Sequence, residues 1–252
     1  MTLSITDQAR VDLAAALRLA ARFDLHEGID NHFSYALNDG TLLVNRWGVH
    51  WSRMTAGDIL QVDGGGAVRR GRGTVERTAL AIHSRVHLAC PYARAILHTH
   101  MTYTTALACT NARIESISQN SLRFCGRVAY DDQYRGLAND NGEGERIAAA
   151  LGNQSILLMR HHGALVTGRT IGLAFDDLYF LERTAQVQVL ARASGYAPIQ
   201  ISDEVADVAA RQISQLDADR ETHFEVLKGL LDDETPKYLS FERDQEAPVV
   251  RK

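Results

Sequence analysis

The chain has 252 residues, of which 45% are hydrophobic and 23% are charged, and its formal net charge is −4. These values are typical of a soluble globular protein with one large domain or two small ones. The weak negative charge gives no reason to expect a nucleic acid or an anionic membrane as a partner. No apolar run approaches the ~20 residues that a membrane-spanning helix needs, and residues 1–10 do not read as a signal peptide. We therefore expect a cytoplasmic protein.

The first third of the chain predicts one helix followed by short strands. Apolar residues recur at close to the helical period over residues 5–23. The expected strands span residues 33–37, 41–44 and 59–62, with hairpin turns at 38–40 and 63–66. The intervening loops at 24–32 and 45–51 carry many functional groups. The basic run at 69–73 is expected to be a solvated loop, with anion binding as the less favoured alternative.

The rest of the chain mixes helices with further strands. The expected helices span residues 78–90, 102–109, 142–151, 171–194 and 203–230, and the expected strands span residues 93–97, 127–130, 155–159 and 164–168. The pattern is continuous and combines hairpins with helices, so it does not indicate a strictly alternating doubly wound sheet. We predict a single α/β domain over residues 1–232, followed by a charged tail at 233–252.

The three cysteines do not predict a disulfide framework, because they are an odd number without paired spacing. Cys90 and Cys109 have apolar neighbours in the sequence, so we expect buried thiols in a reducing compartment. Cys90 and Cys125 lack an adjacent base, and a cysteine nucleophile is therefore not expected.

Two histidine clusters follow two of the predicted buried strands. His98 and His100 come after strand 93–97, and His161 and His162 come after strand 155–159. Residues i and i+2 of a strand point to the same face, so His98 and His100 can direct their rings to a common point. A third imidazole would complete a three-nitrogen site for a divalent metal and leave a position open for water or substrate. The alternative is a group of hydrogen-bonded core histidines, and the presence of two strand-end clusters favours the metal.

A further pair of histidines, His83 and His87, lies one turn apart on one face of the predicted helix 78–90. A second metal pair is possible at this spacing. Structural hydrogen bonding is the favoured interpretation.

Several motifs together resemble the class II aldolase/adducin family, over about residues 9–195. The most specific are His98-Thr99-His100 and His162-Gly163 at this separation. The others are Asn31-His32-Phe33-Ser34, residues 45–52, His83, Ala174-Phe175 and Leu181-Glu182. Within the family, the loop at 47–52 and the stretch at 126–130 look more like the adducin-head branch than the sugar-phosphate aldolases.

The resemblance implies a three-layer α/β/α sandwich with a central mixed, mainly antiparallel sheet. It also implies a homo-oligomer, usually a tetramer, and Zn²⁺, Mn²⁺ or another divalent ion held by His98, His100 and His162. His161 stands where the family often has Asn. We expect His161 and His83 to lie next to the metal ligands and to orient them without binding the metal.

The chain departs from the family aldolases at two places. The aldolases carry a catalytic Glu four residues before the histidine that matches His83, and Ala79 stands there instead. Glu76 lies on nearly the same helical face, so it is our candidate acid/base, with His32 in reserve. An equally weighted alternative is that Glu76 is a first-turn carboxylate favoured by the helix dipole.

The second departure concerns phosphate binding. The aldolases have a Ser-Ser pair just before their catalytic Glu, and Arg77-Thr78 replaces it, so a phosphorylated sugar is less expected. The candidate substrate-binding residues are Asn31 and Gly48, in loops that resemble the family, together with Arg46 and Arg77. Guanidinium groups suit planar anions such as a carboxylate.

These features predict a metal-dependent lyase that forms or cleaves a carbon–carbon bond through an enolate, with a small hydroxy or keto acid or a sugar-like molecule as substrate. Aldol cleavage and decarboxylation share this enolate, and epimerisation is a further activity of the family. The rival prediction is a non-catalytic, oligomeric binding or scaffold protein of the adducin-head type. Ala79 favours that rival, whereas the complete set of three histidines favours the enzyme.

Overall fold

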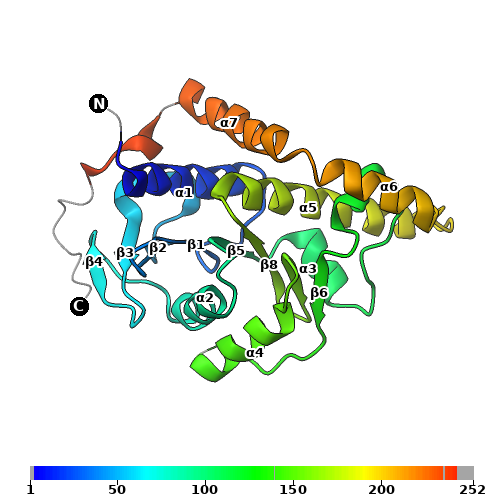
Figure 1. Ribbon diagram of the computed structural model, residues 1–252, viewed down its shortest axis with the longest axis horizontal. Helices are drawn as coiled ribbons and strands as arrows, with labels where there is room; N and C mark the ends of the chain where they lie inside the picture. Colours follow the sequence, from blue (N-terminus) through cyan, green and yellow to red (C-terminus); the bar gives the residue numbers. More distant parts are fainter. Residues whose placement is uncertain (1–2, 139, 235, 243–252) are drawn as a thin grey trace.

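The computed structural model describes residues 3–138, 140–234 and 236–242. Its strands form one eight-stranded sheet (Figure 1). The strand order is β4-β3-β2-β1-β5-β8-β7-β6, and neighbouring strands are antiparallel except for the parallel pair β6 and β7. The sheet is therefore mixed and mainly antiparallel, as predicted. The strands are β1 His32–Ala36, β2 Leu42–Asn45, β3 Ile59–Val62, β4 Val68–Arg70, β5 Ala95–Thr99, β6 Val128–Asp131, β7 Ile156–Met159 and β8 Gly163–Gly168.

Helices cover both faces of this sheet, which gives the expected α/β/α layers (Figure 1). One face carries α1 (Ile5–Arg22) and α5 (Ile171–Ala193), and the other carries α2 (Arg77–Ala89) and α4 (Asn141–Leu151). On the outer side of α1 and α5 lies α7 (Asp217–Glu234). The remaining helices are α3 (Thr102–Ala108) and α6 (Asp203–Ile213). Among the described residues, no helix is both long and apolar enough to cross a membrane.

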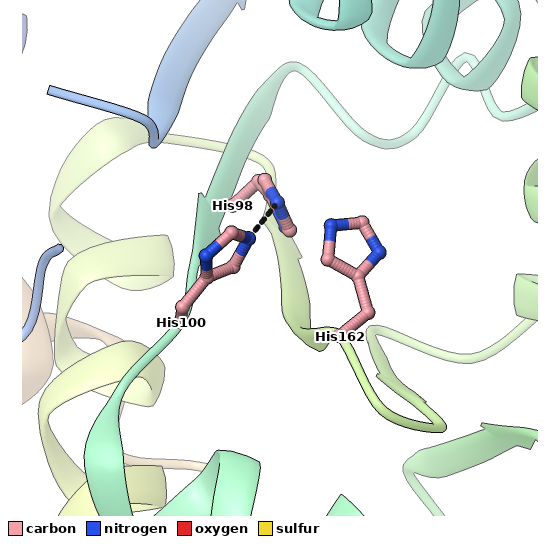
Figure 2. Close-up of side chains that lie close together, drawn as sticks. All are labelled: His98, His100 and His162. Carbon is pink, nitrogen blue, oxygen red and sulfur yellow. Dashed lines mark hydrogen bonds between the residues drawn. The ribbon is translucent and has the colours of Figure 1, made fainter. Parts of the chain in front are cut away.

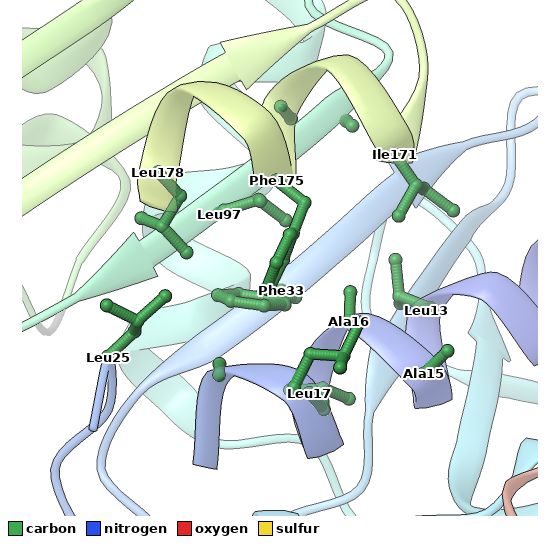
Figure 3. Packing of buried hydrophobic residues seen from close by; sticks show 14 of the residues in the cluster. Leu13, Ala15, Ala16, Leu17, Leu25, Phe33, Leu97, Ile171, Phe175 and Leu178 are labelled. Carbon is green, nitrogen blue, oxygen red and sulfur yellow. The ribbon is translucent and has the colours of Figure 1, made fainter. Parts of the chain in front are cut away.

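Strand alternation assigns apolar and chemically active side chains to opposite faces of β1 and β5. Phe33 of β1 and Leu97 of β5 pack with Phe175 in the core under α1 and α5 (Figure 3). Their neighbours His32 and His98 are paired in register and point to the other face, toward α2. The same residues that hold the two central strands in the core therefore fix where the histidines point.

The predicted helix 203–230 is wrong, because the chain forms two helices, α6 and α7, with a break at 214–216. The Ser214 hydroxyl donates to the carbonyl of Arg211 at 2.8 Å, a local bond of the kind that ends helices. The two helices also pack on different partners, since α6 contacts the 3-10 segment Gln119–Phe124 and α7 contacts α1 and α5.

Three other segments differ from the sequence prediction. Arg69 and Arg70 of the basic run belong to the exposed edge strand β4 instead of a loop. Cys109 is exposed at the end of α3, whereas Cys90 is buried as expected. In the predicted tail, Tyr238 is buried in the main core and donates to Asp232 at 2.6 Å. Residues 235 and 243–252 of that tail lie outside the described residues.

Candidate active site

Three histidines meet at one end of the central strands, on the α2 side of the sheet. His98 lies within β5, which extends to Thr99, and His100 follows directly. His162 belongs to the tight turn that connects β7 to β8, where His161 has a positive φ of 56°. The next residue is Gly163, and a Cβ there would lie only 2.4 Å from the carbonyl oxygen of Thr99. Glycine at 163 therefore lets the turn approach β5 closely enough for the three rings to face one another (Figure 2).

The ring geometry agrees with a shared metal ion. One nitrogen from each of His98, His100 and His162 lies within 4.8 Å of the others. The Nε2 atoms of His98 and His100 are 3.1 Å apart (Figure 2). Two nitrogens bound to one tetrahedral Zn²⁺ at about 2.1 Å lie about 3.4 Å apart, so this spacing is close to that of a ligand pair.

The hydrogen bonds behind two of the rings show which nitrogen is free. The Nδ1 atom of His98 lies 2.9 Å from the carbonyl oxygen of Ala164, and Nδ1 of His100 lies 3.0 Å from a carboxylate oxygen of Glu27. Both oxygens can only accept, so both Nδ1 atoms carry a proton, and in the neutral form of each ring the lone pair is on Nε2. Two lone pairs that face each other repel. A cation between them removes that repulsion, and the donor set therefore fits a divalent ion.

Burial keeps two of these rings in the form that binds metals. It lowers the pKa of His98 well below the usual value for histidine, and it lowers the pKa of His162 to about 4. Both imidazoles are therefore neutral at neutral pH. A neutral imidazole offers the lone pair that a metal ion requires.

A cavity of about 560 Å³ opens in front of the three histidines. Its polar side is formed by these rings with His32, Glu27, Asp30, Glu76 and Thr78, and its apolar side includes Trp47, Ile82, Tyr134, Leu137 and Ala138. None of the described residues that line the cavity is Lys or Arg. A volume of this size is suited to a small organic molecule.

Comparisons with known proteins identify related sequences and structures. The sequence matches the family described as Class II Aldolase and Adducin N-terminal domain over residues 11–189. The chain belongs to this family. It is similar to a putative aldolase class 2 protein of Caulobacter vibrioides, with 32% identity over 81% of this chain and 80% of the relative. It is also similar to the decarboxylase NovR of Streptomyces niveus, with 30% identity over 65% of this chain and 60% of the relative.

A solved structure of the family agrees with the fold over almost the whole chain. It is the L-fuculose 1-phosphate aldolase of Glaciozyma antarctica PI12, which is 26% identical, with a TM-score of 0.82. The superposition covers 94% of this chain and 96% of the aldolase. The expected membership of the class II aldolase/adducin family and the expected fold are both confirmed.

Ala79 stands where the resemblance led us to expect a catalytic Glu, and it is only 1% exposed. The cavity instead receives Glu76, the residue immediately before α2. Its Oε2 accepts a hydrogen bond from the backbone N–H of Ala79 at 2.9 Å and another from the Thr78 hydroxyl. Glu76 is thus the N-cap of α2, one residue before the helix rather than in its first turn. Its helix-capping role and its place in the cavity are compatible.

The reserve candidate His32 also lines the cavity. Its ring centroid lies 4.7 Å from that of His98, and its Nδ1 lies 2.7 Å from Nε2 of His83. His83 is buried behind His32. Its hydrogen bond therefore orients His32 and not one of the three clustered rings. His161 is exposed on the cavity wall, and its ring centroid lies 6.3 Å from that of Tyr134.

The four predicted substrate-binding residues do not line this cavity in the described chain. The Arg46 guanidinium faces Asp58 at 3.7 Å, and Arg77 is exposed. Gly48 is in an exposed turn with φ of 82°, and its neighbour Trp47 lines the cavity instead. Asn31 is buried, and its Oδ1 accepts from the backbone N–H groups of Glu27 and His100. Asn31 therefore positions the loop and the backbone of His100. Substrate binding by these four residues stays a prediction.

Sequence reasoning missed several residues of the site. Glu27 belongs to the loop 24–32, which was noted for its functional groups, but nothing in the sequence connects it to His100, 73 residues away. Tyr134 and Leu137 come from the segment between β6 and α4, where no motif marks them. Glu182 of α5 accepts hydrogen bonds from the backbone N–H groups of Tyr103 and Thr104 and so fixes the start of α3, just after His100.

The bond between Glu27 and His100 gives a first prediction. Replacing Glu27 by Gln removes the negative charge that orients the His100 ring and makes its Nε2 a stronger ligand. We expect the affinity for Zn²⁺ to fall by about 10- to 100-fold, measured by competition with a chromophoric chelator.

The matched control is Asp30→Asn, because Asp30 is an exposed carboxylate on the same cavity wall. Equal losses of affinity in the two variants would show that the general negative charge of the cavity, and not the contact with His100, sets the affinity.

Proposed function

We propose that the protein is a metal-dependent lyase that forms or cleaves a carbon–carbon bond next to a carbonyl group. The observation that carries this proposal is that three converging histidines and the carboxylate of Glu76 line one cavity. Two similar proteins also support this proposal: the solved structure named as an L-fuculose 1-phosphate aldolase and the relative named as the decarboxylase NovR. Aldol cleavage and decarboxylation share an enolate, so one site suits both.

The ion would be held by His98, His100 and His162, with Zn²⁺ and Mn²⁺ as the main candidates. When bound, such an ion acts as a Lewis acid that stabilises negative charge on a carbonyl oxygen. Two features of the protein fix the rings that would hold the ion. Ala164 and Glu27 orient two of the rings, and burial in the sheet holds His98 still.

Proton transfer is assigned to Glu76, with His32 in reserve. Glu76 reaches the cavity from the start of α2, and its position is fixed by the bonds to Thr78 and Ala79. A carboxylate held on the wall of a substrate cavity can accept a proton from a hydroxyl or a carbon and return it later. His32 lies on the same wall and would be the group to examine if Glu76 proves dispensable.

The cavity lining supports an unphosphorylated substrate. A phosphate dianion is usually met by Arg or Lys, and neither lines the described cavity, whereas three carboxylates do. The apolar wall of Trp47, Ile82 and Leu137 suits a hydrocarbon or aromatic portion of the substrate. We therefore propose a small hydroxy or keto acid that chelates the ion.

A second candidate function is a non-catalytic scaffold, as in the adducin-type members of the family. The observation that favours it is Ala79, because it leaves the family's usual catalytic position without a carboxylate. Metal analysis of the purified protein separates the two proposals in part, since an enzyme of this kind needs about one divalent ion per chain.

We also propose a homo-oligomer in the cytoplasm, most simply a tetramer. Helices α5, α6 and α7 present apolar side chains to solvent, each at least 46% exposed, namely Val187, Leu190, Val205, Val208 and Val226. Self-complementary apolar surfaces usually close into symmetric assemblies. Light scattering at micromolar concentration should give about four times the mass of one chain, and a purely monomeric mass would refute the proposal.

The proposed activity is tested by incubating the metal-loaded protein with a panel of unphosphorylated hydroxy and keto acids and identifying the products by NMR. We expect cleavage or decarboxylation of at least one member of the panel, with activity that a chelator abolishes. Turnover of phosphorylated sugars alone would overturn the proposed substrate class. No turnover by protein that contains a full complement of metal would favour the scaffold.

A further inference from the structure

A continuous chain of hydrogen-bonded polar side chains, buried except for the half-buried His87, runs behind the cavity between β1 and α2. It begins at His32, whose Nδ1 lies 2.7 Å from Nε2 of His83. Nδ1 of His83 lies 2.5 Å from the hydroxyl oxygen of Ser34, and that oxygen lies 2.7 Å from Nε2 of His87. Nδ1 of His87 lies 2.8 Å from the carbonyl oxygen of Ala93, where the chain ends.

The geometry of β1 and α2 accounts for the spacing of these side chains. His32 and Ser34 are two residues apart on one face of β1, and His83 and His87 are four residues apart on one face of α2. Ser34 is fully buried, and His83 is 1% exposed. Burial lowers the pKa of His83 far below its usual value and that of His87 to about 4, so both rings are neutral.

The carbonyl of Ala93 sets the direction of every bond in the chain. A carbonyl only accepts, so His87 is protonated at Nδ1 and its Nε2 is an acceptor. The Ser34 hydroxyl therefore donates to His87 and accepts from Nδ1 of His83. Nε2 of His83 is then an acceptor, and it accepts from Nδ1 of His32. A neutral imidazole has one N–H group, so Nε2 of His32 is left with a lone pair.

We propose that Ser34, His83 and His87 are positioning residues that hold His32 in its Nδ1–H tautomer, so that Nε2 presents a lone pair to the cavity.

The opposite direction would lose a hydrogen bond in a buried region. If Ser34 donated to His83 instead, its oxygen lone pairs would face the lone pair on Nε2 of His87 at 2.7 Å. If His87 carried its proton on Nε2, its Nδ1 lone pair would face the Ala93 carbonyl oxygen at 2.8 Å. A buried polar group that loses its hydrogen-bond partner is strongly disfavoured, and this selects one tautomer.

The nearest hydroxyl in the cavity does not change this result. The Thr78 oxygen lies 3.5 Å from Nε2 of His32, but its single proton is donated to Glu76. Nε2 of His32 is therefore open to a hydroxyl group or water in the cavity as a hydrogen-bond acceptor. A carbonyl oxygen at the same place would be disfavoured, because it and the unprotonated Nε2 of His32 can both only accept a hydrogen bond. The assignment depends only on contacts among β1, α2 and the carbonyl of Ala93, so it would hold for a catalytic or a non-catalytic protein.

The test is ¹⁵N NMR of metal-free protein labelled at histidine, with the His32 signals assigned by their loss in His32→Gln. We expect a protonated, pyrrole-type Nδ1 and an unprotonated, pyridine-type Nε2 for His32 at neutral pH. A wild-type protein in which His32 is protonated at Nε2 would overturn the proposal directly, and this result needs no variant to fold.

The variant His87→Leu removes the acceptor at the far end of the chain, and His87 does not line the cavity. The Ser34 hydroxyl is then free to donate to His83, so we expect the His32 proton to move from Nδ1 to Nε2 in most molecules. The control His87→Gln keeps an oxygen acceptor within reach of Ser34 and should retain the wild-type tautomer. An unchanged His32 tautomer in His87→Leu would contradict the proposal. The same change of the His32 tautomer in both variants would also contradict it.

Discussion

Replacing His162 by alanine is expected to lower the affinity for Zn²⁺ by more than about 100-fold, since removal of a ligand costs more than the 10- to 100-fold typical of a supporting residue. His162 is the proposed ligand from the β7–β8 turn, and without it only the two histidines from the end of β5 remain in the converging group. The affinity is measured by chelator competition, and bound metal by elemental analysis of the dialysed protein.

The neighbouring residue provides a matched control in the same turn. His161 is exposed and does not belong to the converging group, so His161→Ala should bind Zn²⁺ with nearly the wild-type affinity. Equal losses in the two variants would show that any change in the turn disturbs the site. Unchanged binding in His162→Ala would exclude the three-histidine metal site.

The second large effect is expected at Glu76. The variant Glu76→Gln keeps the shape of the side chain and removes the group that ionises. On the proposed mechanism, turnover falls by about 10²- to 10⁴-fold while the metal content stays unchanged. The glutamine oxygen can still accept the N–H of Ala79, so the cap of α2 should lose no more than about 1 kcal/mol.

The N-cap of α4 provides the control for this variant. The carboxylate of Asp140 accepts the N–H of Glu143 at 2.9 Å, as Glu76 does for Ala79, but it does not line the cavity. Asp140→Asn should therefore change thermal stability as little as Glu76→Gln and leave turnover unchanged. Full activity in Glu76→Gln would remove Glu76 from the mechanism, and His32→Gln would be the next variant to make.

Much of the fold could be predicted from local sequence signals. The period of apolar residues predicted α1 and α5 to within one residue at each end. The i and i+2 spacing of His98 and His100 predicted that these two rings face a common point, whereas the choice of His162 over His161 came from the family resemblance. These features are local, because each depends on the geometry of one strand or helix and on which of its faces is buried.

The remaining parts of the site depend on contacts that are distant in the sequence. Glu27 reaches His100 only because the loop before β1 folds over the end of β5. Arg46, expected at the substrate, faces Asp58, a pairing set by the register of β2 and β3. The break between α6 and α7 likewise follows from their different packing partners. No local pattern distinguishes these arrangements from the alternatives.

The central claim, that the protein generates an enolate at a metal site, is tested most directly by hydrogen exchange in D₂O. Metal-loaded protein is incubated with small keto acids and hydroxy ketones, and loss of the signal of the proton next to the carbonyl is followed by NMR. We predict exchange of at least one compound that requires the metal and is lost in His162→Ala but not in His161→Ala. Absence of exchange above the metal-free rate for every compound, with about one bound ion per chain, would contradict the claim.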